Sequence, residues 1–245
     1  MADLGDGIDD ADQRRVTTPR PPFRGVLFDM DGVLTDSEPA FYAAVNDVLA
    51  RYNHHIAAAD YAPYIGSATP AMWSALIERF RLPASLDAIL DEYEPPLMAR
   101  LREARPPLPG ARELIDTLRA RGVPVALCTA SYRRWVDAIL AGAGLTGLFD
   151  VIVAGEDVAR PKPDPEPYVS AARLLGLDPR DCVAVEDSVN GLTSALRAGT
   201  YVIQLRATGT AAPPVDGVAL VIASLAEFPL DLLRDSAAPP SPRNR

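Results

Sequence analysis

The sequence predicts an α/β protein with a doubly wound, mostly parallel, Rossmann-like sheet and an inserted all-helical domain. Short β-branched runs alternate with helical patterns over most of the chain, as in sheets whose parallel strands are joined by helices. Runs such as Val125–Cys128 and Cys182–Val185 are almost continuously apolar, which is typical of parallel strands covered on both faces. One long stretch, residues 40–105, shows helical patterns and no convincing strand.

The elements follow from hydrophobic period and β-branched content, in chain order. The expected strands are Gly25–Asp29, Val123–Thr129, Phe149–Ala154, Cys182–Glu186, Tyr201–Leu205 and Val218–Ile222. The expected helices of the sheet domain are Ala111–Ala120, Arg134–Ala141, Glu166–Leu175, Gly191–Ala198 and Leu225–Leu233. In the insert, helices are expected near Ala40–Tyr52, Pro70–Phe80 and Leu86–Arg102.

The insert defines the expected domain organisation. An all-helical stretch of this length between the first and second strands is too long for a crossover connection, so residues 40–105 are predicted to form a separate helical domain. Residues 23–39 and 106–234 then form the sheet domain. Residues 1–22 and 235–245 have no hydrophobic period and are expected to be disordered tails.

Composition excludes several classes of protein. Asp and Glu (33) outnumber Lys and Arg (24), a net charge of −9, which disfavours nucleic acids and anionic membranes as partners. No window holds the roughly 20 apolar residues of a membrane span, and the first residues lack the apolar segment of a secretory signal. Cys128 and Cys182 lie in apolar runs and are expected to be buried thiols of a reducing compartment, although a disulfide between them stays open. We expect a cytoplasmic protein of the size of an enzyme; the oligomeric state is left open.

Side chains at the ends of the strands carry the expected chemistry, because open α/β sheets bind ligands beyond the carboxyl ends of their strands. Asp29 and Asp31 leave the first strand two residues apart, and Gly32 permits a sharp turn after them. Small residues, Thr129-Ala130-Ser131, follow the second strand and lead into a helix N-terminus, a natural phosphate cradle.

A second acidic pair, Glu186 and Asp187, ends the fourth predicted strand, and Lys162 lies between Pro161 and Pro163. Acidic side chains gathered at one edge repel one another without a cation, and oxygen-only ligands favour Mg²⁺. A metal, a lysine and backbone N–H donors describe a site for a phosphoryl group. In such a site one carboxylate attacks phosphorus to form an aspartyl phosphate, and another moves protons.

Four segments together resemble the motifs of the haloacid dehalogenase-like hydrolase superfamily, in that family's order and spacing. They are Phe28–Glu38 (FDMDGVLTDSE), Cys128–Ser131, Pro161–Pro163 and Glu186–Gly191. The resemblance extends over about residues 24–233. The helical insert is similar to the α-helical cap of the β-phosphoglucomutase-like and sugar-phosphatase branch.

The resemblance implies a role for each matching position. Asp29 is expected to be the nucleophile and a Mg²⁺ ligand, and Asp31 the general acid/base with its backbone carbonyl on the metal. Lys162 is expected to neutralise the charge that Asp29 and the phosphoryl group share. The remaining roles are phosphoryl binding for Thr129, Ala130 and Ser131, and metal binding for Asp187 and, directly or through water, for Glu186.

The same resemblance separates reaction classes. Dehalogenases of the superfamily lack a carboxylate at the position of Asp31, so dehalogenation is disfavoured. Four positions depart from the β-phosphoglucomutase pattern: Thr69 stands in place of an arginine, Phe41 in place of a histidine, and Tyr132-Arg133 in place of a lysine–asparagine pair. We therefore expect a Mg²⁺-dependent phosphatase acting on a small phosphomonoester, with a sugar phosphate as the expected substrate.

Two alternatives remain at this stage. The first is a sugar-phosphate mutase, in which the phosphoryl group returns to a sugar hydroxyl; Arg133 and Arg134 are then candidates for substrate phosphate. The second is a catalytically silent sugar-phosphate sensor, which has no need of Asp31.

Several residues also have simpler interpretations. Thr129 and Ser131 are candidates for capping the helix that begins near Tyr132, and Asp36–Glu38 for hinge and N-cap positions of the first cap helix. The pair His54-His55 is expected in a surface turn, and Met72 and Trp73 in the core of the cap.

Overall fold

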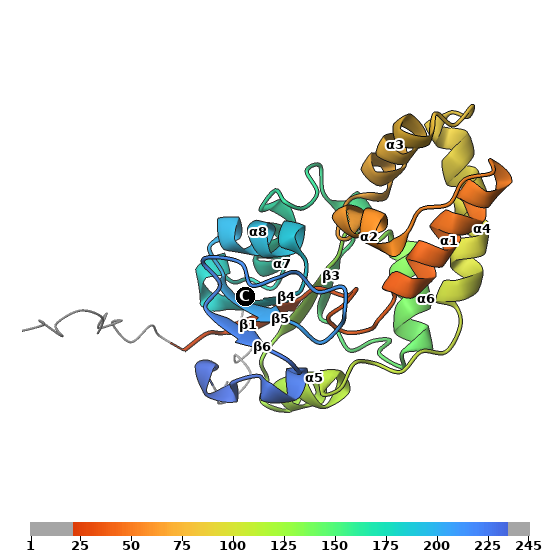
Figure 1. Ribbon diagram of the computed structural model, residues 1–245. Coiled ribbons are helices and arrows are strands. Elements are labelled where there is room, and N and C mark those ends of the chain that lie inside the picture. The colour runs from red at the N-terminus through yellow and green to blue at the C-terminus, as the bar shows by residue number, and fades with distance from the viewer. Residues whose placement is uncertain (1–21, 235–245) are drawn as a thin grey trace, which may run out of the picture.

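A six-stranded, all-parallel sheet forms the centre of the protein in the computed structural model, which describes residues 22–234 (Figure 1). The spatial order is β3-β2-β1-β4-β5-β6, so the chain starts in the middle and winds outward in both directions. The predicted fold class is confirmed. The strands are β1 (Gly25–Phe28), β2 (Val125–Cys128), β3 (Val151–Val153), β4 (Cys182–Glu186), β5 (Tyr201–Leu205) and β6 (Leu220–Ile222).

Alternate residues of β1 are buried against different helices, as the two-residue period of a strand requires. Val26 and Phe28 belong to the apolar cluster that includes side chains of α5 (Ala111–Ala120) and α6 (Arg133–Gly142). Leu27 belongs to a second cluster, with α7 (Glu166–Leu174) and α8 (Val189–Ala198). All three side chains are fully buried. The sheet is therefore covered on both faces, which explains its continuous apolar runs.

Four helices between β1 and β2 lie together beside the sheet domain (Figure 1). They are α1 (Glu38–Arg51), α2 (Ala58–Tyr61), α3 (Thr69–Phe80) and α4 (Leu86–Leu101), with a 3₁₀ turn at Ala62–Tyr64. We call residues 38–105 the cap. The ring of Trp73 packs edge-on against that of Tyr93, with 5.3 Å between centroids, and Trp73 and Tyr93 are both buried, as expected for Trp73. The division into domains at residues 39 and 106 stays a prediction.

Cap and sheet domain contact each other through α4 and α6. Glu94 of α4 accepts hydrogen bonds from two side chains of α6, Arg134 Nη2 at 2.8 Å and Trp135 Nε1 at 3.0 Å. Arg133 pairs with Asp157 instead. These partners hold Arg133 and Arg134 outside the cavity described below, whose lining includes neither of them.

One predicted helix is wrong. Leu225–Leu233 forms two 3₁₀ turns, Leu225–Glu227 and Leu230–Leu232, because Pro229 lies between them and has no N–H for a continuous helix. The short helix α2 was not predicted, and the ends of the other elements lie within two residues of the predicted bounds. Residues 1–21 and 235–245, nearly all of the two predicted tails, lie outside the described residues.

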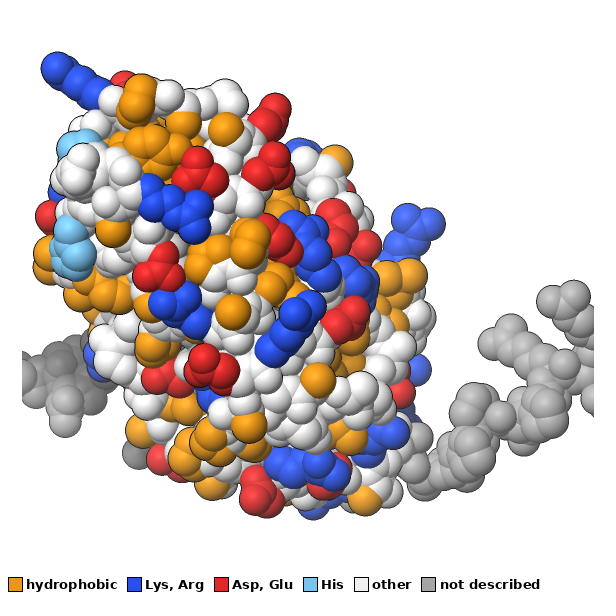
Figure 2. All heavy atoms as spheres, turned by 90° about the vertical axis from the view of Figure 1, so that its right-hand side faces the viewer, with side chains coloured by type: hydrophobic (Ala, Val, Ile, Leu, Met, Phe, Trp, Pro, Cys, Tyr) orange, Lys and Arg blue, Asp and Glu red, His pale blue; other side chains and the backbone are white. Residues whose placement is uncertain are grey.

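The outer surface of the cap carries mixed charge. On the face that bears α1 and α4, acidic and basic side chains are interspersed, and neither sign forms a broad patch (Figure 2). His54 and His55 are exposed, as expected. Within residues 22–234, no helix is long and apolar enough to cross a membrane. Cys128 and Cys182 are buried free thiols.

Candidate active site

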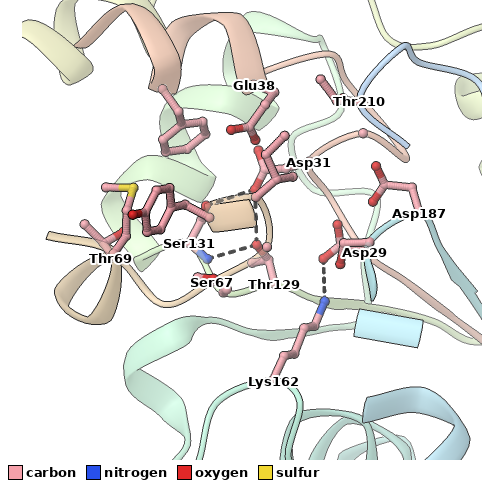
Figure 3. A pocket seen from close by; sticks show the side chains of 18 of the residues that line it. Asp29, Asp31, Glu38, Ser67, Thr69, Thr129, Ser131, Lys162, Asp187 and Thr210 are labelled. Carbon is pink, nitrogen blue, oxygen red and sulfur yellow. Dashed lines mark hydrogen bonds and ion pairs between the residues drawn. The ribbon is translucent and has the colours of Figure 1, made fainter. Parts of the chain in front are cut away.

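The ends of β1, β2 and β4 meet at one edge of the sheet, beside the cap. Backbone pairing places Phe28 next to both Leu127 and Val185, so the residues that follow these strands come together. A cavity at this edge is lined by Asp29, Asp31, Lys162 and Asp187 from the sheet domain and by side chains of the cap (Figure 3). The segments that the sequence predicts to act together therefore converge.

Lys162 is the only lysine in the sequence, and its ammonium lies between two carboxylates. Its Nζ is 2.6 Å from Oδ1 of Asp29, 2.5 Å from Oε1 of Glu186 and 2.9 Å from the carbonyl oxygen of Cys128. The side chain of Lys162 is only 3% exposed. Burial disfavours its charge, but the two carboxylates prevail and raise the pKa of Lys162 above its ordinary value. The lysine is therefore a fixed positive charge.

Glu186 is held by hydrogen bonds on both oxygens. Oε1 accepts from Lys162 and from the Tyr168 hydroxyl at 3.0 Å. Oε2 accepts from the backbone N–H groups of Asp187 at 2.9 Å and Ser188 at 3.1 Å, at the start of α8. This saturation orients Glu186 toward Lys162 and supports a role in placing the lysine.

Asp29 is buried at the end of β1. Burial raises the pKa of its carboxyl to about 8, and the adjacent ammonium of Lys162 acts in the opposite direction. The anionic form, which a nucleophile needs, therefore depends on nearby positive charge. Lys162 supplies one such charge at hydrogen-bond distance.

Three hydroxyl groups surround the Asp31 carboxyl. The Ser37 hydroxyl donates to Oδ1, and the hydroxyls of Ser131 and Thr129 lie 2.9 and 3.5 Å from Oδ2. Burial raises the pKa of Asp31, and these hydrogen bonds oppose the shift. A carboxyl that is fixed in position and more easily protonated than usual suits proton transfer.

The loop after β2 offers donors at the cavity wall. The backbone N–H of Thr129 donates to Val153, and its hydroxyl accepts from the N–H of Ser131 at 3.0 Å. Within the described chain the N–H of Ala130 makes no hydrogen bond, although Ala130 lines the cavity. The helix-capping interpretation of Thr129 and Ser131 is wrong, because α6 has Tyr132 at its N-cap and no side-chain cap.

An oxygen-rich group fits a divalent cation. Carboxylate oxygens of Asp29, Glu186 and Asp187 lie within 4.8 Å of one another. Oδ1 of Asp187 is buried without a hydrogen-bond partner among the described residues. Burial and then the charge of Glu186 raise the pKa of Asp187 well above its usual range. A cation bound here would therefore reduce the repulsion among these buried carboxylates. Oxygen-only donors match Mg²⁺.

Sequence reasoning missed several residues of the cavity, among them Glu38, Tyr61 and Tyr93. Ser37 does occupy the predicted N-cap position of α1, but its hydroxyl contacts Asp31 and caps nothing. Glu38 follows it, and its side chain lies beside Asp31 in the cavity (Figure 3). The only signal for Glu38 was its place inside the first motif. No signal marked Tyr61 or Tyr93.

The chain is similar in sequence and in structure to known proteins. A family model described as haloacid dehalogenase-like hydrolase matches residues 23–199. Hexitol phosphatase B of Escherichia coli is 33% identical over 75% of this chain and 83% of its own length. The bifunctional riboflavin kinase/FMN phosphatase of Arabidopsis thaliana is 32% identical over 73% of this chain, which spans only 47% of that longer protein.

Among solved structures, CbbY from Rhodobacter sphaeroides in complex with xylulose-(1,5)bisphosphate superimposes with a TM-score of 0.78. It is 26% identical and covers 86% of this chain and 99% of its own. A β-phosphoglucomutase from Clostridium difficile, with a TM-score of 0.75 and 18% identity, shares the fold. With the family model covering most of the described chain, the protein belongs to the haloacid dehalogenase-like hydrolase family.

Proposed function

We propose that the protein is a phosphatase that hydrolyses a small phosphomonoester through an aspartyl phosphate. The observation that carries the proposal is the position of Lys162, buried 2.6 Å from Asp29 in a cavity that also holds Asp31. Relatives named hexitol phosphatase and FMN phosphatase support hydrolysis of a phosphate ester. A pure sensor would have no use for the hydroxyl-bound carboxyl of Asp31.

In the first half-reaction an oxygen of Asp29 attacks phosphorus, and the bond from phosphorus to the leaving oxygen breaks. Asp31 gives its proton to that oxygen, and the alcohol departs. Lys162 balances the negative charge that Asp29 and the phosphoryl group share, while the Ala130 N–H is available to a phosphoryl oxygen.

In the second half-reaction Asp31 takes a proton from water as the water oxygen attacks phosphorus. The bond from Asp29 to phosphorus breaks, which releases inorganic phosphate and restores both carboxyl groups to their starting states. Asp31 is fixed by Ser37, Ser131 and Thr129, so one carboxyl serves both proton transfers from one position.

Mg²⁺ is the cofactor that this donor set fits, with Asp29 and Asp187 as its carboxylate ligands and the Asp31 carbonyl as a third. Both oxygens of Glu186 already accept hydrogen bonds, which favours its acting on the ion through water. When bound, the ion supplies charge neutralisation for the attacking and transferring oxygens.

The test is phosphate release from sugar, polyol and other small phosphomonoesters, with Mg²⁺ and with EDTA. Release from the wild type that needs the metal and is abolished in Asp29→Asn supports the proposal. Because Asp29→Asn removes a buried charge and keeps the shape, circular dichroism should show an intact fold. Turnover that survives in Asp29→Asn would remove Asp29 as the nucleophile. Isomerisation of a sugar phosphate without phosphate release would instead favour a mutase.

A further inference from the structure

Glu38 lies where two cavities meet. The cavity that contains Asp29 and Asp31 has a volume of about 60 Å³, close to the space of a few water molecules at about 15 Å³ each. A second cavity of about 780 Å³ adjoins it between the cap and the start of α8. Glu38, Tyr61, Ile65, Ser188 and Thr210 line both. An alcohol bonded to the transferring phosphate would therefore pass Glu38 on its way outward.

The cap side of the smaller cavity has polar groups with free hydrogen-bonding capacity. The hydroxyl of Tyr93 is buried and has no hydrogen-bond partner in residues 22–234. Tyr61 is also buried and lines both cavities together with Glu38. A buried hydroxyl without a partner costs free energy unless a ligand satisfies it.

Charge restricts what the two cavities accept. Among the described residues, Lys162 is the only lysine or arginine that lines either cavity, and it is already paired with Asp29 and Glu186. Four carboxyl groups line the smaller cavity, from Asp29, Asp31, Glu38 and Asp187. The larger cavity has room for a second phosphate, but that phosphate would meet Glu38 and no cation.

We propose that Glu38 and Tyr93 bind the leaving group, and that they select phosphomonoesters of uncharged polyhydroxy alcohols over bisphosphates. This inference rests on the proposed phosphatase activity. The carboxyl of Glu38 accepts a hydrogen bond from one hydroxyl of the substrate, and the Tyr93 hydroxyl forms a hydrogen bond with another. A site built to bind hydroxyls rejects an alcohol that lacks them, because its own buried groups are then left unpaired.

The proposed specificity differs from the ligand that a structural neighbour binds. CbbY has a similar fold, and its solved structure contains xylulose-(1,5)bisphosphate, a ligand with two phosphates. Here the cap side of the cavity contributes Tyr61, Tyr64, Ser67, Thr69 and Tyr93, which offer hydroxyls and no positive charge. A polyol phosphate fits that chemistry and a bisphosphate does not.

The experiment measures kcat/KM for hexose and hexitol monophosphates, for fructose 1,6-bisphosphate and for phenyl phosphate. For the wild type, kcat/KM should be about 100-fold higher for the best monophosphate than for the bisphosphate. A ratio of this size is expected from burying one charged group, the second phosphate, without a partner. Glu38→Gln and Tyr93→Phe should each lower kcat/KM for that monophosphate by about tenfold or more. In the same variants, the decrease in kcat/KM for phenyl phosphate, whose leaving group carries no further hydroxyl, should be several-fold smaller.

The cap supplies a matched control pair outside both cavities. The Tyr52 hydroxyl donates to Glu92 at 2.8 Å and neither residue lines a cavity, so Tyr52→Phe and Glu92→Gln should leave all these values unchanged. Tyr93→Phe should unfold at the same temperature as wild type or higher, because the lost hydroxyl has no partner. A clear drop in that temperature would overturn the assignment of Tyr93.

The outcomes separate the two claims. If wild type releases phosphate from none of these esters, the proposed phosphatase activity fails and the inference fails with it. If wild type hydrolyses the bisphosphate as well as the monophosphate, or if Glu38→Gln and Tyr93→Phe lose phenyl phosphate activity to the same extent, the phosphatase assignment stands and the leaving-group assignment is overturned.

Discussion

A side chain at position 191 would collide with Glu186: a Cβ atom built on Gly191 lies 1.6 Å from Oε1 of that carboxylate. Glu186 itself holds Lys162, with 2.5 Å between Oε1 and Nζ. The first turn of α8 therefore approaches the carboxylate so closely that only glycine fits. Position 191 thus controls, through Glu186, where the lysine lies.

Gly191→Ala should reduce turnover by about tenfold or more while the protein still folds. The methyl group pushes the Glu186 carboxylate away from Lys162, and misplacement of a catalytic charge by about 1 Å costs up to 100-fold. Thr193→Ala is the control on the same helix, because Thr193 lines neither cavity and its hydroxyl donates only to the carbonyl oxygen of Val189 within α8. Equal activity of Gly191→Ala and wild type in steady-state kinetics would show that Glu186 does not place the lysine.

Lys162→Met should lower the free energy of unfolding by about 3–5 kcal/mol at pH 7, because Asp29 and Glu186 are then buried charges without a cation. The loss should be larger at pH 9 than at pH 7, because the pKa of Asp29 is about 8 with the lysine present and higher without it, so only the wild type ionises Asp29 as the pH rises through 8. Urea unfolding at the two pH values measures it. Arg160→Met removes the exposed ion pair with Glu166 and should cost less than about 1 kcal/mol. A pH-independent loss in Lys162→Met would contradict the prediction.

Asp187→Asn should abolish the response to Mg²⁺ and stabilise the metal-free protein. Asp187 is buried beside Glu186 with one oxygen unpartnered, so removing its charge relieves repulsion and also removes a ligand. Thermal unfolding with Mg²⁺ and with EDTA tests both effects. In wild type, Mg²⁺ at about 100 times its Kd should add about 2.7 kcal/mol. Asp216→Asn, an exposed position outside the cavity, should behave as wild type.

Glu38→Gln should stabilise the protein progressively more as the pH rises from about 4.5 to about 7. Burial, and then the charge of Asp31, raise the pKa of Glu38 from 4.5 to about 7. Stability that wild type has below pH 4.5 is therefore lost as the pH rises through 7, whereas glutamine does not ionise. The difference in unfolding free energy should level off above pH 7, at roughly 3 kcal/mol or less. A flat difference across this range, like that expected for Glu92→Gln, would be inconsistent with a raised pKa.

Local sequence was enough to predict the sheet side of the site. Asp29 and Thr129 each follow a buried strand and Glu186 ends one. Strands of a parallel sheet end at a common edge, so the meeting of these residues follows from the strand pattern once the topology is known. The strand boundaries were nearly right for the same reason. The predicted helix Leu225–Leu233 was wrong, because its apolar residues have helical spacing but Pro229 has no N–H to continue a helix.

The cap side of the site was harder to predict. Glu38 was expected at a hinge or N-cap position, and Tyr93 was only one residue of the expected helix Leu86–Arg102, since the pattern of a helix says which face is apolar and nothing about what covers it. Whether Tyr93 is a packed core residue or an unpartnered donor in a cavity depends on how α4 lies over the sheet edge.

The sequence by itself determined the doubly wound sheet, the helical insert and the acids and lysine of the expected chemistry, because those signals are periodic or local in the chain. Only the tertiary structure decided that Glu186 holds Lys162 from one side while Asp29 holds it from the other, and that Glu38 and Tyr93 line the space where a leaving group would lie. These relationships join residues up to 133 positions apart. They depend on packing of the cap and of α8 against the sheet, which no short segment specifies.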